Sequence, residues 1–166
     1  MRAAGRDGAE RTNEMWAGGV RVILFDEAGR VLLVRQRHEG RDIWMPPGGG
    51  IEAGEDAVRA AAREVLEETG IVVEIGPLIW HVEAVSPDGE QRFVNFFLAK
   101  AVSGAAGLGV DPEFDAAHQV LRELRYFSRA ELAALPRVYP SMLREELWAV
   151  AARGGPVGDV FRIRED

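Results

Sequence analysis

Apolar residues and turn-forming residues alternate along the first part of the chain in a pattern that predicts strands. Two apolar runs, 20–25 and 31–34, flank the short sequence DEAG at 26–29, which is typical of a turn. The two runs are therefore expected to form a hairpin. A polar and charged segment, 35–43, follows them and leads into a glycine- and proline-rich loop at 46–50.

The spacing of apolar residues then changes to that of a helix. Residues 56–69 are predicted to form a helix with one apolar face, because small and apolar residues recur every three or four positions. The residues on this face are Ala57, Val58, Ala61, Ala62 and Val65. Gly70 is well placed to end the helix as a left-handed cap.

The second half of the chain is predicted to hold three strands and two helices. The strands are 78–85, 91–101 and 121–127. The Asp88-Gly89 pair between the first two strands predicts a hairpin turn. Ser128 and Glu131 form a capping box before a short helix, and Pro140 opens a final one. Because strands and helices mix without regular βαβ alternation, the fold class is predicted to be α+β.

The length of 166 residues suits one compact domain. Residues 1–14 are predicted to form a disordered tail, residues 15–155 the domain, and residues 156–166 a C-terminal tail. Neither a signal peptide nor a run of ~18 apolar residues is visible in the sequence. A cytoplasmic protein without a membrane partner is therefore expected.

Composition excludes several kinds of chemistry. The chain has no cysteine, so disulfides, thiolate catalysis and cysteine-based zinc sites are excluded. Its formal net charge is -7, which disfavours binding to a nucleic-acid polymer. A small phosphorylated ligand remains compatible with this charge if a cation bridges the two acidic partners.

Three glutamates crowd one face of the predicted helix. Glu64 lies three residues before Glu67 and four before Glu68, so the three carboxylates repel one another. The negative end of the helix dipole adds to this repulsion. A divalent cation would reverse it, and oxygen ligands suit Mg²⁺ or Mn²⁺. Three glutamates alone, however, favour the simpler interpretation of a solvated acidic face.

The same glutamates form part of a longer pattern that resembles the Nudix box, G-x5-E-x7-R-E-U-x-E-E-x-G-U, in which U is a bulky aliphatic residue. The matching positions are Gly49, Glu55, Arg63, Glu64, Val65, Glu67, Glu68, Gly70 and Ile71. Every specified position of the 23-residue pattern is matched, which makes chance agreement very rare. Trp44 and the segment 125–128 are also similar to the family. The resemblance implies an α/β/α sandwich around a mixed β-sheet.

The resemblance also implies an activity. Members of the family hydrolyse a phosphoanhydride bond in a nucleoside diphosphate linked to another moiety, using water activated by Mg²⁺, for which Mn²⁺ can substitute. The metal ligands implied here are the three glutamates of the helix and the backbone carbonyl of the residue before the first glycine of the box: Gly48, Glu64, Glu67 and Glu68.

The implied catalytic set combines a base with orienting residues. Glu64 is the first candidate for the general base, with Glu67 or Glu68 as alternatives. Glu55 and Arg63 are expected to orient the ligand helix, because an arginine can hold carboxylates in a bidentate fork.

Residues outside the box carry weaker expectations. Some relatives recruit a further carboxylate from a later loop, and the candidates here are Glu113, Asp115 and Glu123. Three arginines before the glycine loop are candidates for contacting substrate phosphates, or are ordinary surface charges: Arg35, Arg37 and Arg41.

Two other functions are considered beside hydrolysis. A non-catalytic nucleotide-binding or regulatory module on the same fold is disfavoured, because the box is intact. An isomerase of isoprenoid diphosphates is disfavoured, because that chemistry needs a cysteine or an equivalent acid and the chain has no cysteine. The sequence leaves open which nucleotide derivative is the substrate, and also whether the chain forms a homodimer, as many relatives do.

Overall fold

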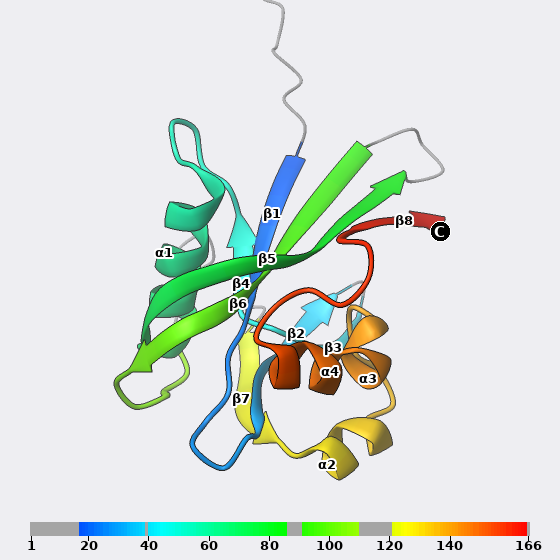
Figure 1. Ribbon diagram of the computed structural model, residues 1–166. Coiled ribbons are helices and arrows are strands. Elements are labelled where there is room, and N and C mark those ends of the chain that lie inside the picture. Colours follow the sequence, from blue (N-terminus) through cyan, green and yellow to red (C-terminus); the bar gives the residue numbers. More distant parts are fainter. Residues whose placement is uncertain (1–16, 39, 86–90, 110–120, 166) are drawn as a thin grey trace, which may run out of the picture.

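Two β-sheets and four helices make up the part of the chain that the computed structural model describes, residues 17–38, 40–85, 91–109 and 121–165. Helix α1 (Ala57–Thr69) lies on one side of the sheets, and the C-terminal helices lie on the other side (Figure 1). Those helices are α2 (Arg129–Ala134), α3 (Met142–Glu145) and α4 (Leu147–Arg153). The expected three-layer arrangement, with helices on both faces of mixed sheet, is confirmed.

The larger sheet has five strands in the order β4-β1-β6-β5-β8. These strands are β1 (Ala17–Ile23), β4 (Gly48–Gly50), β5 (Val72–Val85), β6 (Gln91–Ser103) and β8 (Phe161–Glu165). Strand β1 runs parallel to β6 and β5 runs parallel to β8, whereas the other two pairs are antiparallel. The sheet is therefore mixed, as expected.

The smaller sheet has the order β3-β2-β7, and both of its pairs are antiparallel. Its strands are β2 (Val31–His38), β3 (Arg41–Met45) and β7 (Leu121–Phe127). The polar segment 35–43 thus belongs to a β2–β3 hairpin, which turns at Gly40, where φ is 74°. The sequence did not predict this hairpin, because its charged side chains do not alternate with apolar ones.

Two apolar clusters hold the layers together. The cluster on the α1 side packs Ala60, Ala61 and Val65 of that helix against residues of β1 and β2. The cluster on the other side packs the C-terminal helices against the sheets through Leu132, Leu143, Leu147 and Val150. The alternation of side chains along each strand divides the residues between these clusters.

Helix α1 has a defined beginning and end, and its end at Gly70 is confirmed. The Asp56 side chain accepts a hydrogen bond of 2.8 Å from the Arg59 amide, which caps the N-terminus. Gly70 ends the helix with φ 72°, and its amide donates to Leu66 O. The amide of Gly109 donates to Glu68 O at 2.7 Å, so the segment that follows β6 satisfies a further carbonyl at this end.

The first predicted hairpin forms only next to its turn. The turn at 26–29 exists, and an isolated antiparallel bridge joins Phe25 to Val31 beside it. Beyond that bridge the two strands enter different sheets, because β4 and β6 occupy both edges of β1.

The capped helix that follows Ser128 is confirmed as α2. The helix expected from Pro140 is divided at Glu146 into α3 and α4.

The C-terminal segment also differs from the expected tail. Residues 161–165 form β8, which lies parallel to β5, and the amide of His81 donates to Val160 O at 2.8 Å. Strand β5 provides an open edge for this pairing. Such a long-range contact cannot be predicted from a short charged segment.

The proposed domain boundaries remain predictions, and residues 1–14 lie outside the described residues. The turn expected at Asp88-Gly89 also lies outside them, although β5 and β6 pair antiparallel as expected.

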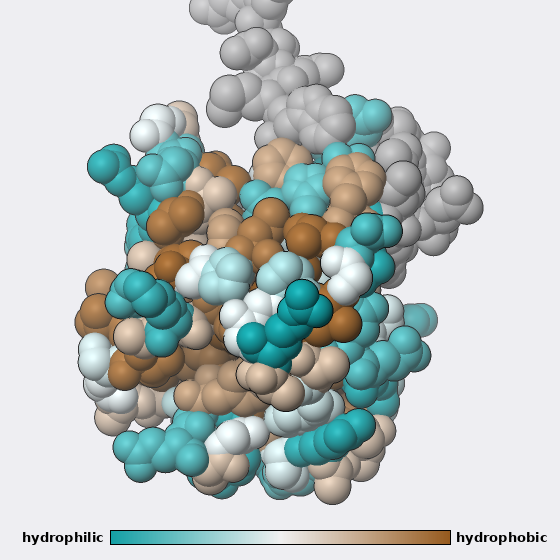
Figure 2. Space-filling model, viewed as in Figure 1, coloured by the Kyte–Doolittle hydropathy of each residue, from teal (hydrophilic) through white to brown (hydrophobic). Residues whose placement is uncertain are grey.

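The surface carries both polar and apolar side chains, and the apolar ones gather in some places. Figure 2 shows one such area near α1, the start of β5 and the end of β6, where Leu66, Val72 and Val102 are exposed. In the part of the chain that is described, no helix combines the length and the apolar character needed to cross a membrane.

The capping box of α2 predicts a pH dependence of stability. Hydrogen bonds from the Ser128 amide and hydroxyl lower the pKa of Glu131 below its ordinary value of 4.5. A lowered pKa in the folded state stabilises the fold above the unfolded pKa, and this contribution is lost as pH falls through the folded pKa. Between about pH 5 and pH 3, the Tm of Glu131→Gln is therefore expected to fall less than that of the wild type.

Thermal unfolding followed by circular dichroism across this range measures the difference. The same substitution made in a Ser128→Ala background is the control, and it should change the pH slope less, because one donor to the carboxylate is gone. Equal slopes in the wild type and Glu131→Gln would contradict the prediction.

Candidate functional site

Arg63 lies at the centre of a network that joins α1 to the glycine-rich loop. Its Nε and Nη2 donate to the two carboxylate oxygens of Glu55, both at 2.9 Å. Nη2 also donates to the carbonyl of Gly50 at 3.0 Å. Nη1 donates to Glu64 Oε1 at 2.8 Å and to Glu67 Oε2 at 3.0 Å. One guanidinium group thus binds three carboxylates and a loop carbonyl.

The electrostatics of this network follow from its geometry. The bidentate pair with Arg63 lowers the pKa of the Glu55 carboxyl, so Glu55 stays ionised. The same hydrogen bond to Glu55 raises the pKa of Arg63 further above its already high value. The guanidinium therefore remains a permanent cation, and it offsets part of the repulsion among the glutamates.

Glu64 is the most enclosed carboxylate of the Arg63 network. Its side chain is only 14% exposed, and this burial raises its pKa, which the hydrogen bond from Arg63 opposes. A Cβ atom on Gly49 would lie 2.6 Å from the Glu64 carboxylate, so only glycine leaves room for this carboxylate at the loop. Glycine at position 49 therefore serves to admit Glu64.

Glu68 faces a different set of donors. Its Oε2 accepts a hydrogen bond of 2.9 Å from the Gly48 amide, and its Oε1 accepts one of 3.0 Å from Gln36 Nε2. Gly48 has φ 151°, and a Cβ there would lie 2.0 Å from Val20 O. The chain can therefore follow this path only with glycine. Glu68 links α1 both to the glycine loop and to strand β2.

The oxygen-rich cluster has the donor chemistry that a hard divalent cation requires. Glu64 Oε1 and Glu67 Oε2 approach the same nitrogen of Arg63, so these two carboxylates converge on one point. Among the described residues, no group of three acidic or histidine side chains is gathered closely enough to enclose an ion as it stands. Binding of a cation would thus require the glutamates to exchange some hydrogen bonds for metal contacts.

The candidate site residues outside the box lie among other neighbours than the carboxylate cluster. Arg35 lies between Asp42 and Glu123, at 3.4 and 3.2 Å, and Arg37 lies 3.7 Å from Asp42. The side chain of Arg41 is exposed at the start of β3. Arg35 is the neighbour of Gln36 in strand β2, and successive side chains of a strand point to opposite faces. The side chain of Arg35 therefore points away from the face on which Gln36 contacts Glu68. Glu113 and Asp115 lie outside the described residues.

Gln36 is the member of the cluster that sequence reasoning missed. It is 32 residues away from Glu68 in the chain and lies in a charged segment, so it was not singled out. Only the pairing of β2 in the smaller sheet brings its amide to the helix. A polar side chain on the otherwise apolar face of Leu32 and Val34 is the one available signal.

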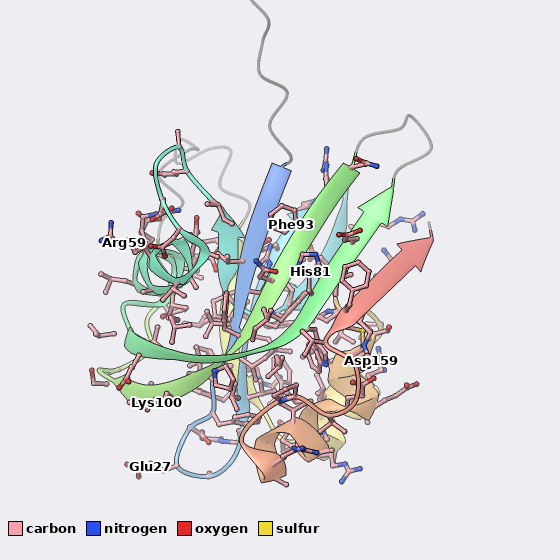
Figure 3. The ribbon with its side chains drawn as sticks, turned by 45° about the horizontal axis from the view of Figure 1, so that its top comes forward. Glu27, Arg59, His81, Phe93, Lys100 and Asp159 are labelled. Carbon is pink, nitrogen blue, oxygen red and sulfur yellow. The ribbon has the colours of Figure 1, made fainter. Side chains whose placement is uncertain are left out.

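His81 has a structural environment, as its position in a strand predicts. Its ring stacks between Phe93 and Phe161, with centroid distances of 5.4 and 5.3 Å. Its Nδ1 lies 2.6 Å from Asn95 Oδ1. Figure 3 shows His81 and Phe93 beside each other on the sheet and Arg59 on the outer side of α1. This aromatic row is separate from the carboxylate cluster.

Comparison with known proteins agrees with this geometry. The family model of the NUDIX domain matches residues 15–146. A MutT NUDIX hydrolase from Burkholderia pseudomallei superposes with a TM-score of 0.63 at 28% identity, over 79% of this chain and 96% of that one. A NUDIX hydrolase from Nitrosomonas europaea has a TM-score of 0.68 at 24% identity, over 90% and 79%. The second similarity supports the fold alone.

Curated relatives are similar over shorter stretches. An RNA pyrophosphohydrolase from Dinoroseobacter shibae is 51% identical over 55 residues, which are 33% of this chain and 34% of that protein. The phosphatase NudJ from Escherichia coli is 38% identical over 71 residues, which are 43% and 46% of the two chains. The chain thus spans between about a third and a half of the length of these two relatives.

The Arg63 network predicts a specific loss of stability. Arg63→Lys keeps the charge but cannot make the bidentate pair with Glu55 while also reaching Gly50 O. The free energy of unfolding is expected to fall by about 1–3 kcal/mol, since hydrogen bonds to charged groups are lost. Urea denaturation monitored by tryptophan fluorescence measures this change.

Arg59→Lys is the matched control on the same helix. Arg59 is 78% exposed and pairs only loosely with Asp56 at 3.6 Å. This substitution should change the free energy of unfolding by less than about 0.5 kcal/mol. Similar values for the two variants would show that the Arg63 network does not stabilise the fold.

Proposed function

Because this chain belongs to the NUDIX domain family, we propose that it hydrolyses a phosphoanhydride bond in a nucleoside diphosphate linked to another moiety, in a reaction that depends on Mg²⁺. Mn²⁺ is expected to substitute. The names of the relatives indicate different activities: one is an RNA pyrophosphohydrolase, one a putative 8-oxo-dGTP diphosphatase and one a phosphatase. The proposal therefore specifies the bond that is cleaved and leaves the attached group open.

One observation carries the proposal. Glu64 and Glu67 meet at one nitrogen of Arg63, beside Gly49, where a Cβ would overlap the Glu64 carboxylate. A helix surface selected only for solubility would not need a partly buried carboxylate such as Glu64, because burying a charge is unfavourable. A site that must bind a cation and a diphosphate does need this arrangement.

The metal-holding groups in this proposal are those that the family resemblance implies. Glu64, Glu67, Glu68 and the carbonyl of Gly48 would hold the cation. When bound, the cation supplies positive charge to the diphosphate oxygens and makes a water molecule easier to deprotonate. Glu64 is our first candidate to accept that proton, with Glu67 or Glu68 as alternatives.

Glu55 and Arg63 act as positioning residues in this proposal. The bidentate pair keeps the loop against the helix, and Nη1 holds the carboxylates of Glu64 and Glu67 on the same side. A correctly placed set of ligands is the main contribution that a protein makes to phosphoryl-group chemistry, where positioning and electrostatics dominate.

A substrate panel tests the activity. Phosphate release after coupling to a phosphatase is measured for nucleoside diphosphate derivatives with Mg²⁺ or Mn²⁺, for the wild type and for Glu67→Gln. Activity should require the cation and fall at least about 100-fold in the variant, since even residues that only orient a metal ligand contribute about 10- to 100-fold. Glu74→Gln, an exposed glutamate paired with Lys100 on the larger sheet, should retain activity.

A folded wild type that turns over no member of a broad panel would overturn the proposed activity. If such a protein still bound Mg²⁺ and a nucleotide in calorimetry, the result would support the non-catalytic binding module instead.

The glycine loop predicts a second difference in activity. Gly49→Ala would place a Cβ 2.6 Å from the Glu64 carboxylate and force that group to move, so kcat should fall by about 10- to 100-fold. Gly50→Ala is the neighbouring control, because a Cβ there meets no atom within 4 Å. Steady-state kinetics with the best substrate of the panel measures both. Equal kcat values for the two variants would rule out the proposed reason for glycine at position 49.

A further inference from the structure

Gln36 reaches the carboxylate cluster from strand β2, outside the box. Its Nε2 donates to Glu68 Oε1 at 3.0 Å, while the Gly48 amide donates to Glu68 Oε2 at 2.9 Å. Both oxygens of this carboxylate are therefore held by donors, one from the smaller sheet and one from the glycine loop. Glu68 is only 5% exposed. A buried carboxylate needs such donors, because it has lost most of its contact with water.

The pairing of β2 is irregular where Gln36 lies. Strands β2 and β7 pair regularly up to Arg35, and their register shifts between Arg35 and Gln36. Such a shift re-aims side chains, and β-bulges are over-represented beside active sites. Leu32 and Val34, which lie on the same face of β2 as Gln36, are fully buried in apolar clusters. A polar side chain in this row requires a polar partner, and Glu68 is that partner.

Position 36 is neutral in a segment that is otherwise charged. Arg35 and Arg37 flank it, and both have carboxylate partners away from the cluster. Arg35 lies 3.4 Å from Asp42 and 3.2 Å from Glu123, and Arg37 lies 3.7 Å from Asp42. The face of β2 that meets α1 is thus left to an amide, although arginines stand on both sides of it in the sequence.

A neutral donor suits a carboxylate that also has to serve a cation. Each oxygen of an ionised carboxylate has two lone pairs, so Glu68 can accept from Gln36 and Gly48 and retain capacity for a further contact. A lysine or an arginine at position 36 would instead neutralise Glu68 and repel a divalent cation, and a carboxylate there would repel Glu68 itself. Donors that hold a metal ligand in place commonly contribute to metal affinity.

We propose that Gln36 is a positioning residue for the cation site and that it acts by holding the carboxylate of Glu68 toward the glycine loop. This inference rests on the proposed function, in which Glu68 is one of the metal ligands. It deepens that function by adding a residue of the smaller sheet to the site. The affinity of the protein for its cation then depends on the pairing of β2 as well as on helix α1.

Binding of Mn²⁺ to the metal-free protein tests the inference without a substrate. Electron paramagnetic resonance measures free Mn²⁺ during the titration. Gln36→Met nearly keeps the length of the side chain but has no donor, so the Kd for Mn²⁺ should rise by about 10- to 100-fold. Gln36→Lys places a cation beside Glu68 and should raise the Kd further. Gln91→Met, the same change at an exposed position of β6, is the matched control and should leave the Kd unchanged.

A double-mutant cycle shows whether Gln36 acts through Glu68. Glu68→Gln removes the charge that Gln36 is proposed to position, while Glu64 and Glu67 remain to bind Mn²⁺. Adding Gln36→Met to this variant should therefore change the Kd by less than about twofold. An equal effect of Gln36→Met in both backgrounds would overturn the inference. A lowered Tm of Gln36→Met with a wild-type Kd would also overturn it, because Gln36 would then only stabilise the fold.

The outcomes separate this inference from the proposed function. A Kd that rises in Gln36→Met and depends on Glu68 would support the inference even in a protein that hydrolyses no member of the substrate panel, where the proposed activity fails. An unchanged Kd in Gln36→Met, in a protein with metal-dependent turnover, would overturn the role of Gln36 and leave the hydrolase activity standing.

Discussion

The interaction on which the site depends is the set of hydrogen bonds made by the Arg63 guanidinium. Three carboxylates and a backbone carbonyl share its donors, at distances between 2.8 and 3.0 Å. Without a fixed cation, the glutamates of this helix would repel one another and the negative end of the helix dipole. Arg63 makes the acidic face compatible with a stable fold, while Glu64 stays partly buried.

This network works only if the loop lies directly against the helix. Gly48 and Gly49 permit that approach, because side chains there would overlap Val20 O and the Glu64 carboxylate. Pairing of β4 with β1 holds the loop in the larger sheet, while Gln36 links Glu68 to the smaller one. The cluster thus lies where both sheets meet α1, so a change in the packing of either sheet would alter the geometry of the carboxylates.

The opposite side of the sheets offers a different chemistry. There the C-terminal helices and β8 enclose a cavity that is mostly apolar, with Arg162 at its wall. In the proposed function, the chemistry of bond cleavage belongs to α1 and to the glycine loop beside it.

The sequence by itself determined the elements whose signals are local. Helix α1, its Gly70 cap and the capping box of α2 follow from residues within a few positions of one another, and the spacing of the box identified Glu64, Glu67 and Glu68 as one face. Only the tertiary structure decided which strands pair. It placed β1 and β2 in separate sheets, added β8 where a tail was expected, and brought Gln36 to Glu68 and Arg162 to the cavity. The physical reason is that strand pairing joins backbone groups far apart in the chain, and those groups are the same for every sequence, so local patterns do not encode the partner.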